Sequence, residues 1–256
     1  MGCLMKSPIK DRRFKNLSVS YIKSIAPAGT RINSYGLFSG NAELSLSASR
    51  NVTAVTAKSI IFNFWYCLVE DAEYLYSIVT DKSFKFHESE FQILQEKLTT
   101  FTDPFYRSAL FFLLNRCSST GQISCGEFDP SQYNAVALNY LRSFKKPENF
   151  KPHREGSLMS HLHSAYSECD YVLFPSLQFN YNLFDYGKST GYDTEYYNHS
   201  KIRDFLATEH QKTILAYNYH PSLQQFYDGF NFQPIDRFGQ PTESIQNCEE
   251  IIVTNF

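Results

Sequence analysis

The stretch Arg31-Ile32-Asn33-Ser34-Tyr35-Gly36-Leu37-Phe38-Ser39-Gly40 reads as a β-strand that ends in a glycine turn. The segments after it alternate in type. Ala42 to Ser49 has helical character, Asn51 to Ala57 alternates like a short strand, and residues 60–80 place apolar side chains at helical spacing. Strand, helix, strand, helix is the usual opening of a doubly wound α/β sheet. Residues 1–80 are therefore predicted to form the N-terminal part of a Rossmann-like core.

Residues 81–165 interrupt this alternation. Phe91 to Leu98, Asp103 to Asn115 and Ser131 to Phe144 are helix-like, and residues 145–154 read as a basic loop. We therefore expect an inserted, mostly helical subdomain over this part of the chain.

Alternation resumes in residues 166–256, which we expect to complete the α/β core. The predicted helices cover residues 200–209 and 221–229. The predicted strands cover residues 171–174, 212–218 and, as a final edge strand, 249–255. The predicted fold class is α/β, a Rossmann-like sheet with an inserted helical subdomain.

The composition is that of a globular protein, with 43% apolar, 20% charged and 16% aromatic residues. A net charge of −2 argues against attraction of the whole molecule to nucleic acid, so any DNA contact requires a local patch. The six cysteines show no CxxC spacing, which favours reduced thiols in an intracellular protein, either cytoplasmic or within a virus-infected cell or virion. No apolar run reaches the ~18 residues of a membrane span, so we expect no membrane partner.

Five segments carry a further signal through their order. They are Phe38-Ser39-Gly40, Ile61-Phe62-Asn63-Phe64-Trp65, Phe111 to Arg116 with Gly121 and Gly126-Glu127-Phe128 after it, Tyr217-Asn218, and Glu249 to Phe256. Together they resemble the DNA adenine methylase family, in the branch whose target-recognition domain lies between the cofactor motif and the catalytic motif. The resemblance implies a methyltransferase sheet, S-adenosylmethionine as cofactor and adenine in DNA as substrate.

The catalytic motif of that family is degraded here. Its Asp-Pro-Pro-Tyr falls on Phe174-Pro175-Ser176-Leu177. In the family the Asp and a prolyl carbonyl accept hydrogen bonds from the adenine amine, and the Tyr stacks on the flipped base. Phe174 has no acceptor and Leu177 has no π-face. Asp170 lies about four residues earlier, and at ~3.3 Å per residue it is too far from the motif to replace the lost acid.

The positions that hold the cofactor in the family have changed too. Where the family has a carboxylate before its Phe-x-Gly turn, this chain has Gly36. Where the family has the second glycine of that turn, this chain has Ala42. The family's ribose-binding carboxylate falls near Thr56. The N-terminal Gly-Gly-Lys-like stretch has its nearest match at residues 15–20, which contain no glycine. Each lost charge-assisted hydrogen bond is worth roughly 1.5–3 kcal/mol, so two losses weaken binding by about 10²–10⁴-fold.

These departures predict a catalytically inactive homologue with no cofactor. We expect it to bind DNA or, as the aromatic content favours, a protein partner such as an active methyltransferase subunit or a viral assembly component. The alternative is a divergent active enzyme that binds S-adenosylmethionine and uses Ser176 or Asn218 as the amine acceptor.

Basic residues between the predicted helices and the catalytic strand are candidate DNA contacts, with Phe144 and Phe150 among them to stack on bases. The alternative is a solvated loop. The candidates are Arg116, Arg142, Lys145, Lys146, Lys151 and Arg154. The basic residues 6–15 form either a solvated arm or a further phosphate contact.

A histidine cluster and a stretch after a predicted strand are two further candidate sites, and for both we favour a structural role. His153, His161 and His163 favour a polar surface over a metal site, and we predict no metal. The stretch Tyr217-Asn218-Tyr219-His220-Pro221 follows a strand, where ligands often bind, but an aromatic plug is the favoured reading.

Overall fold

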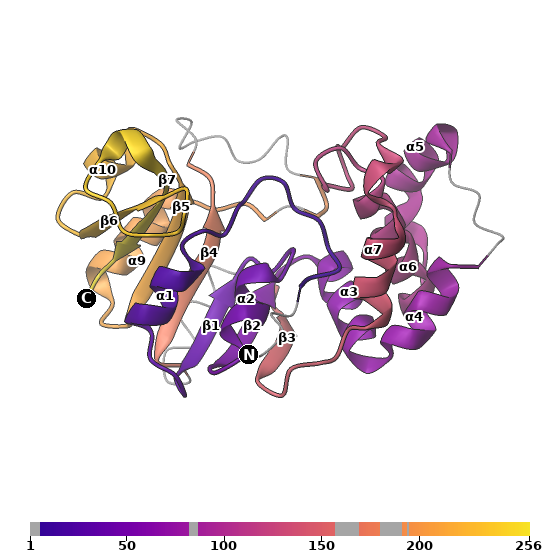
Figure 1. Cartoon of the computed structure of the whole chain (residues 1–256), viewed down its shortest axis with the longest axis horizontal. Helices are drawn as coiled ribbons and strands as arrows, with labels where there is room; N and C mark the ends of the chain where they lie inside the picture. Colours follow the sequence, from indigo (N-terminus) through magenta and orange to yellow (C-terminus); the bar gives the residue numbers. More distant parts are fainter. Residues whose placement is uncertain (1–5, 82–86, 157–168, 180–190, 194) are drawn as a thin grey trace.

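The protein is described by a computed structural model, which covers residues 6–81, 87–156, 169–179, 191–193 and 195–256 (Figure 1). The strands are β1 Arg31–Tyr35, β2 Asn51–Thr56, β3 Phe150–Arg154, β4 Tyr171–Leu177, β5 Thr213–Asn218, β6 Asn231–Asp236 and β7 Cys248–Thr254. They form one sheet in the order β3-β2-β1-β4-β5-β7-β6. The first five in that order are parallel, and β7 runs antiparallel to both β5 and β6.

Helices cover both faces of the sheet. They are α1 Val19–Ile25, α2 Asn41–Leu46, α3 Ser59–Glu70, α4 Ala72–Val79, α5 Glu88–Lys97, α6 Pro104–Arg116, α7 Ala135–Arg142, α9 His199–Thr208 and α10 Leu223–Phe226, with short 3-10 turns at Leu98–Thr100, Pro130–Gln132 and Ile245–Asn247. Because side chains alternate along a strand, β4 sends Leu173 to the core under α1 and α2, and Phe174 to the core under α9. The fold is therefore a Rossmann-like α/β sheet, as predicted.

The helices α3 to α7 gather beside β3 at one end of the molecule (Figure 1), and we call them the helical layer. At their centre is α6, which begins at Pro104 after the capping carboxylate of Asp103 and is buried from Ser108 to Asn115. A helix that is apolar on all sides must be enclosed, and α3 and α4 pack against it. The helical layer thus includes helices that precede residue 81.

Three expectations about the sheet were wrong. Residues 150–154 are not a loop but the edge strand β3, which pairs in parallel with β2. The strand β7 is not at an edge, because β6, which was not predicted, lies outside it. The strand β4 does not end at Phe174 but continues to Leu177, with a register shift against β5 between these residues.

The order of the strands defines one special position. Connections lead from β1 toward β2 on one side and from β4 toward β5 on the other, so the topology switches between β1 and β4. In open α/β sheets, ligands bind outside the carboxyl ends of the strands at such a point.

Candidate functional site

The structure brings the predicted cofactor and catalytic positions to one edge of the sheet. Gly36 follows the end of β1, Thr56 ends β2, Leu177 ends β4 and Asn218 ends β5. We call this the switch-point edge. Its surroundings determine whether a ligand has room to bind.

The phenol of Tyr197 lies directly over Gly36. Gly36 has φ +91°, and a Cβ built on it would lie 1.6 Å from the Tyr197 hydroxyl oxygen. The ring of Tyr197 packs edge-on against Phe174 with centroids 5.7 Å apart, and Phe174 stacks on Tyr35 at 5.4 Å. Burial, with Glu195 and Glu43 nearby, raises the pKa of Tyr197 well above its ordinary value. A neutral aromatic column therefore fills the space beside the end of β1.

The carboxylate of Glu195 lies at the end of β2. The Thr56 hydroxyl and the Ala57 backbone N–H both donate to Glu195 Oε1, each at 2.7 Å. The Thr56 hydroxyl oxygen also accepts from the Lys58 backbone N–H at 3.1 Å. The end of β2, where the resemblance places a ribose-binding acid, thus has an acid supplied by a segment 139 residues away.

The predicted cofactor turn is packed against α3. The indole N–H of Trp65 donates to the Phe38 carbonyl at 2.9 Å. Gly40 has φ +68°, and a Cβ there would lie 2.5 Å from the Trp65 ring. Ala42 is buried. These positions are occupied by protein packing, and the close approach of Trp65 explains why Gly40 has no side chain.

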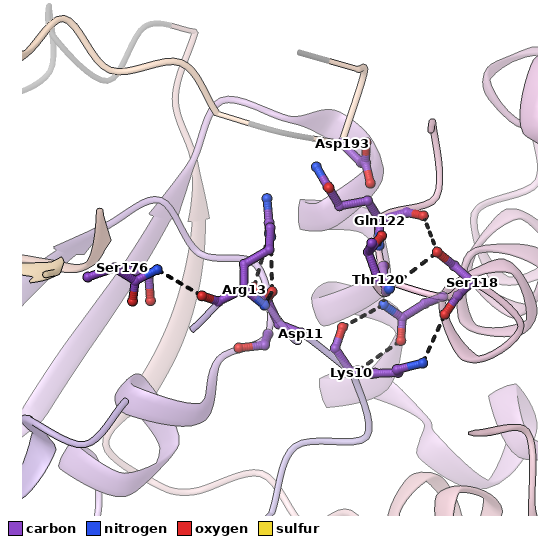
Figure 2. Close-up of polar contacts among 12 residues, drawn as sticks. Lys10, Asp11, Arg13, Ser118, Thr120, Gln122, Ser176 and Asp193 are labelled. Carbon is purple, nitrogen blue, oxygen red and sulfur yellow. Dashed lines mark hydrogen bonds and ion pairs between the residues drawn. The ribbon is translucent and has the colours of Figure 1, made fainter. Parts of the chain in front are cut away.

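Residues 7–18, which we call the N-terminal arm, cross the switch-point edge between the helical layer and α1 (Figures 1 and 2). The Asn218 amide donates to the Arg13 carbonyl at 2.9 Å, and the Ser176 hydroxyl donates to Asn16 Oδ1 at 3.3 Å. Both groups that were considered as substitute amine acceptors are therefore bonded to the arm.

The Arg13 side chain fills the middle of this edge. Its guanidinium forms a bidentate ion pair with Asp11, at 2.9 and 3.0 Å, and lies 4.7 Å from the centroid of the Phe38 ring. Burial lowers the pKa of Arg13, but the Asp11 carboxylate outweighs this effect and the net pKa is raised. The guanidinium therefore stays charged while it covers Phe38.

Asn115 anchors the arm to the helical layer. Its amide accepts from the Lys10 backbone N–H at 2.8 Å and donates to the carbonyls of Lys10 and Gly121 at 2.9 and 2.6 Å. The Lys10 ammonium donates to the Ser118 carbonyl at 2.9 Å, and burial lowers the pKa of Lys10 to about 8. The reading of this segment as a solvated arm is wrong, because Ser7 and Lys10 are buried.

Asp193 attaches a second segment, residues 191–193, to the turn that follows α6. Its carboxylate is 1% exposed and accepts from the Ile123 backbone N–H at 2.7 Å and from the Ser124 hydroxyl. Gly191 lies so close to Ser124 that a Cβ would clash with it. The N-terminal arm and the segment that contains Asp193 are thus both bonded to the helical layer or the turn after it.

The segment from Phe174 to Leu177, which the resemblance matches to the catalytic motif, is part of the core. Phe174, Pro175 and Leu177 are buried, and Ser176 is half-buried. Asp170 is at the opposite end of β4, where it accepts from the Arg31 backbone N–H at 2.8 Å. The structure thus brings no carboxylate from β4 to the switch-point edge.

The end of β5 contributes Tyr217 to a buried aromatic cluster. The Tyr217 hydroxyl lies 2.9 Å from His199 Nδ1 and 2.8 Å from the Tyr227 hydroxyl. The ring of Phe179 covers His199 at 5.3 Å. Burial lowers the pKa of His199 to about 4. This arrangement agrees with the aromatic plug favoured from sequence.

The candidate DNA contacts separate into two groups. Five of them are exposed and follow one another from the end of α7 through the loop into β3. We call these the basic edge patch: Arg142, Lys145, Lys146, Lys151 and Arg154. Arg116 is apart from them, because its guanidinium donates to the Pro8 carbonyl and burial lowers its pKa to about 10.

The two aromatic residues of this segment do not face solvent. Phe150 and Phe144 are 1% and 7% exposed and pack against Trp65, with centroids 5.5 and 6.1 Å from the indole. The expectation that they stack on bases is therefore wrong. Their apolar rings complete the core between α3 and β3.

Sequence reasoning missed Glu195, Tyr197 and Asp193, and it included Arg13 only as part of a basic segment. None of them lies in a recognisable motif, and the first two contact positions more than a hundred residues earlier in the chain. A partial signal was present in Gly36, since a glycine after a strand indicates either a turn or a close approach by another group.

His161 and His163 lie outside the described residues, and His153 is 3.7 Å from Glu155. Within the described ranges, no three His, Cys, Asp or Glu side chains gather as metal ligands. In the same residues, every helix is too short or too polar to cross a bilayer.

Comparison with known proteins adds no assignment. No protein-family model matches the chain, and no curated protein matches its sequence. Its function must therefore be argued from the switch-point edge and the surface around it.

Proposed function

We propose that this protein is a catalytically inactive homologue of the DNA adenine methylases that acts as a DNA- or protein-binding subunit. The sheet supports this, because the resemblance implies a Rossmann-like fold and the strands form one mostly parallel α/β sheet. The ordered motifs of the sequence support it independently.

One observation carries the proposal: the chain fills its own cofactor positions. The Tyr197 phenol lies over Gly36, and the Glu195 carboxylate is bonded to Thr56 and Ala57. A nucleoside at the switch point would have to displace both. Hydrogen bonds to a charged group contribute about 1.5–3 kcal/mol each, so displacing the two to Glu195 weakens binding by roughly 10²–10⁴-fold.

The environment of the degraded catalytic motif supports the loss of activity. An adenine amine needs an acceptor aimed at its protons before it can attack a methyl group. At this edge the Ser176 hydroxyl and the Asn218 amide are bonded to the N-terminal arm. Access of an adenine to either group would need the arm to move, and the arm is bound to Asn115 by two hydrogen bonds of the Lys10 backbone.

A divergent active enzyme is the second candidate, and Glu195 is the observation that favours it. Its carboxylate lies at the end of β2, where a ribose diol would need an acceptor. In this reading Tyr197 moves aside and Glu195 replaces the missing acid.

Calorimetric titration with S-adenosylmethionine up to millimolar concentration distinguishes the two functions. We expect no binding to the native protein. The second candidate predicts micromolar binding that Glu195→Ala weakens at least tenfold, and methyl transfer to adenine-containing DNA. Glu209→Ala is the control, because this half-buried residue follows α9. Micromolar binding to the native protein would overturn the proposal.

Protein binding has separate support in exposed aromatic side chains. Phe238, in the turn after β6, is 71% exposed, and Tyr74 on α4 is 52% exposed. Aromatic residues of this kind are enriched at the centres of protein interfaces. A protein partner therefore remains part of the proposed function beside DNA.

A further inference from the structure

The basic edge patch concentrates positive charge on one flank of the molecule. Residues 142–154 contain five basic residues and one acidic residue, a net charge of +4. The whole chain carries −2, so the remaining residues carry −6. A cluster of this sign on an acidic protein is a local polyanion site, not a reflection of overall composition.

The patch is available for an external anion. All five cations are exposed, and within the described residues none of them lies in an ion pair with a carboxylate. Arg142 rests its guanidinium over the Tyr76 ring at 5.5 Å, which leaves its charge at the surface. Lysines often keep edge strands from pairing, which accounts for Lys151, but Lys145 and Lys146 precede the strand.

The chemistry of the patch favours a phosphate backbone over a protein surface. Protein interfaces are depleted of lysine and centre on apolar anchors. Here three of the five residues are lysines, and the aromatic residues of the segment are turned inward onto Trp65. Without exposed rings the patch cannot stack single-stranded bases, so it fits the backbone of a duplex.

We propose that the basic edge patch binds double-stranded DNA through its phosphates, without reading base sequence. The inference rests on the proposed function and names its partner. The duplex would lie along β3 and the loop before it, beside the helical layer, and would reach the switch-point edge at Arg154, which pairs in register with Thr56. The base sequence and the ends of the duplex should not affect its affinity, because the patch contacts only the charged phosphate backbone.

The test is fluorescence anisotropy with a labelled 20-base-pair duplex of arbitrary sequence, titrated with the full chain at 50 to 200 mM salt. We expect dissociation constants near 10⁻⁴–10⁻⁶ M at physiological salt. With four to five phosphates contacted, affinity should fall roughly 100-fold or more across that range. A second duplex of unrelated sequence should bind equally.

Charge reversal locates the site. Lys145→Glu with Lys146→Glu should weaken binding at 50 mM salt more than tenfold and reduce the salt slope by about 2. The matched control is Lys97→Glu with Lys201→Glu, which makes the same charge change at exposed residues on α5 and α9. Lys145→Gln with Lys146→Gln should give a smaller loss in the same direction, and thermal melting checks that each variant is folded.

Three outcomes would overturn the inference. They are no binding at 50 mM salt, equal loss in the control pair, or displacement of the duplex by polyglutamate at matched charge, which would assign the patch to an acidic protein. Each leaves the inactive-site proposal intact. Conversely, micromolar binding of S-adenosylmethionine would overturn that proposal without changing the duplex titration.

Discussion

At the switch-point edge, polar side chains of the sheet are bonded to groups far away in the sequence, whereas the cations of the basic edge patch lie on the surface. Thr56, Ser176 and Asn218 each have partners 139 to 205 residues distant. The difference shows that a cluster of polar residues can have either a structural role or a role at the surface. At the first region the cluster holds the fold together, and at the second the fold would be complete without it.

Removing the Asn115 amide should have the largest effect. Asn115→Ala leaves three backbone groups of the arm and the Gly121 turn without partners in a buried site. At about 1–3 kcal/mol per unsatisfied group, we expect a loss of about 4 kcal/mol in the free energy of unfolding. Urea unfolding measures it. Asn139→Ala on the exposed side of α7 should change it by less than about 0.5 kcal/mol, and a similar small loss at Asn115 would show that the arm is not held there.

Acid should weaken the part of the edge built around His199. Its pKa is near 6.5 in the unfolded chain and about 4 in the folded protein, so the unfolded state binds the proton more tightly. The contribution to stability is present above pH 6.5 and is lost as pH falls toward 4. Its total is about 3 kcal/mol.

The measurement is the urea midpoint between pH 6.5 and 4.5. His199→Gln should flatten this dependence, and His210→Gln, at an exposed position, should not. An equal slope in both variants would assign the acid sensitivity to other groups.

A Cβ at Gly36 tests the contact with Tyr197 directly. Gly36→Ala meets both a positive φ and the Tyr197 hydroxyl oxygen. Gly229 has φ +88° with open space around it, so Gly229→Ala reports the backbone effect alone, about 1 kcal/mol. We expect Gly36→Ala to lose about 2 kcal/mol more than this control.

The double variant completes the cycle. In a Tyr197→Ala background the extra loss at Gly36 should largely disappear, because the clashing atom is gone. Additive losses would mean that Tyr197 does not occupy the space over Gly36 in solution.

The smallest effect on stability is expected at the basic edge patch. Lys145→Glu with Lys146→Glu should change the free energy of unfolding by less than about 0.5 kcal/mol, because exposed residues away from special contacts are nearly neutral. Thermal unfolding at two salt concentrations measures this. A large loss in the free energy of unfolding would show that the patch stabilises the fold, as the switch-point edge does.

The strands that sequence predicted are those buried on both faces. In β4 and β5 nearly every residue is buried, which produces the apolar runs of a parallel sheet. The missed strands β3 and β6 are at the two edges, and each contains a proline, Pro152 and Pro234. Edge strands tolerate proline and need no apolar run, so their sequences resemble loops.

The sequence predicted which residues lie at the strand ends of the site, but not which residues contact them. Local motifs located Gly36, Thr56, Ser176 and Asn218 at strand ends, because a strand end is visible in the sequence itself. The groups that contact them come from residues 11–16 and 195–197, and no local pattern encodes a contact across more than a hundred residues. The positions of strand ends can thus be predicted from the sequence, but the groups that contact them are known only from the folded chain.

The N-terminal arm also has a consequence for synthesis. Its Leu17 and Ser18 amides donate to the Glu250 carboxylate, and Asn218 holds the Arg13 carbonyl. A ribosome that adds about 5–20 residues per second needs roughly 10–40 s to reach Asn218 after Arg13. During that interval the arm has emerged without its last partners. The arm therefore lacks its bonds to Asn218 and Glu250 until nearly all of the protein has been made.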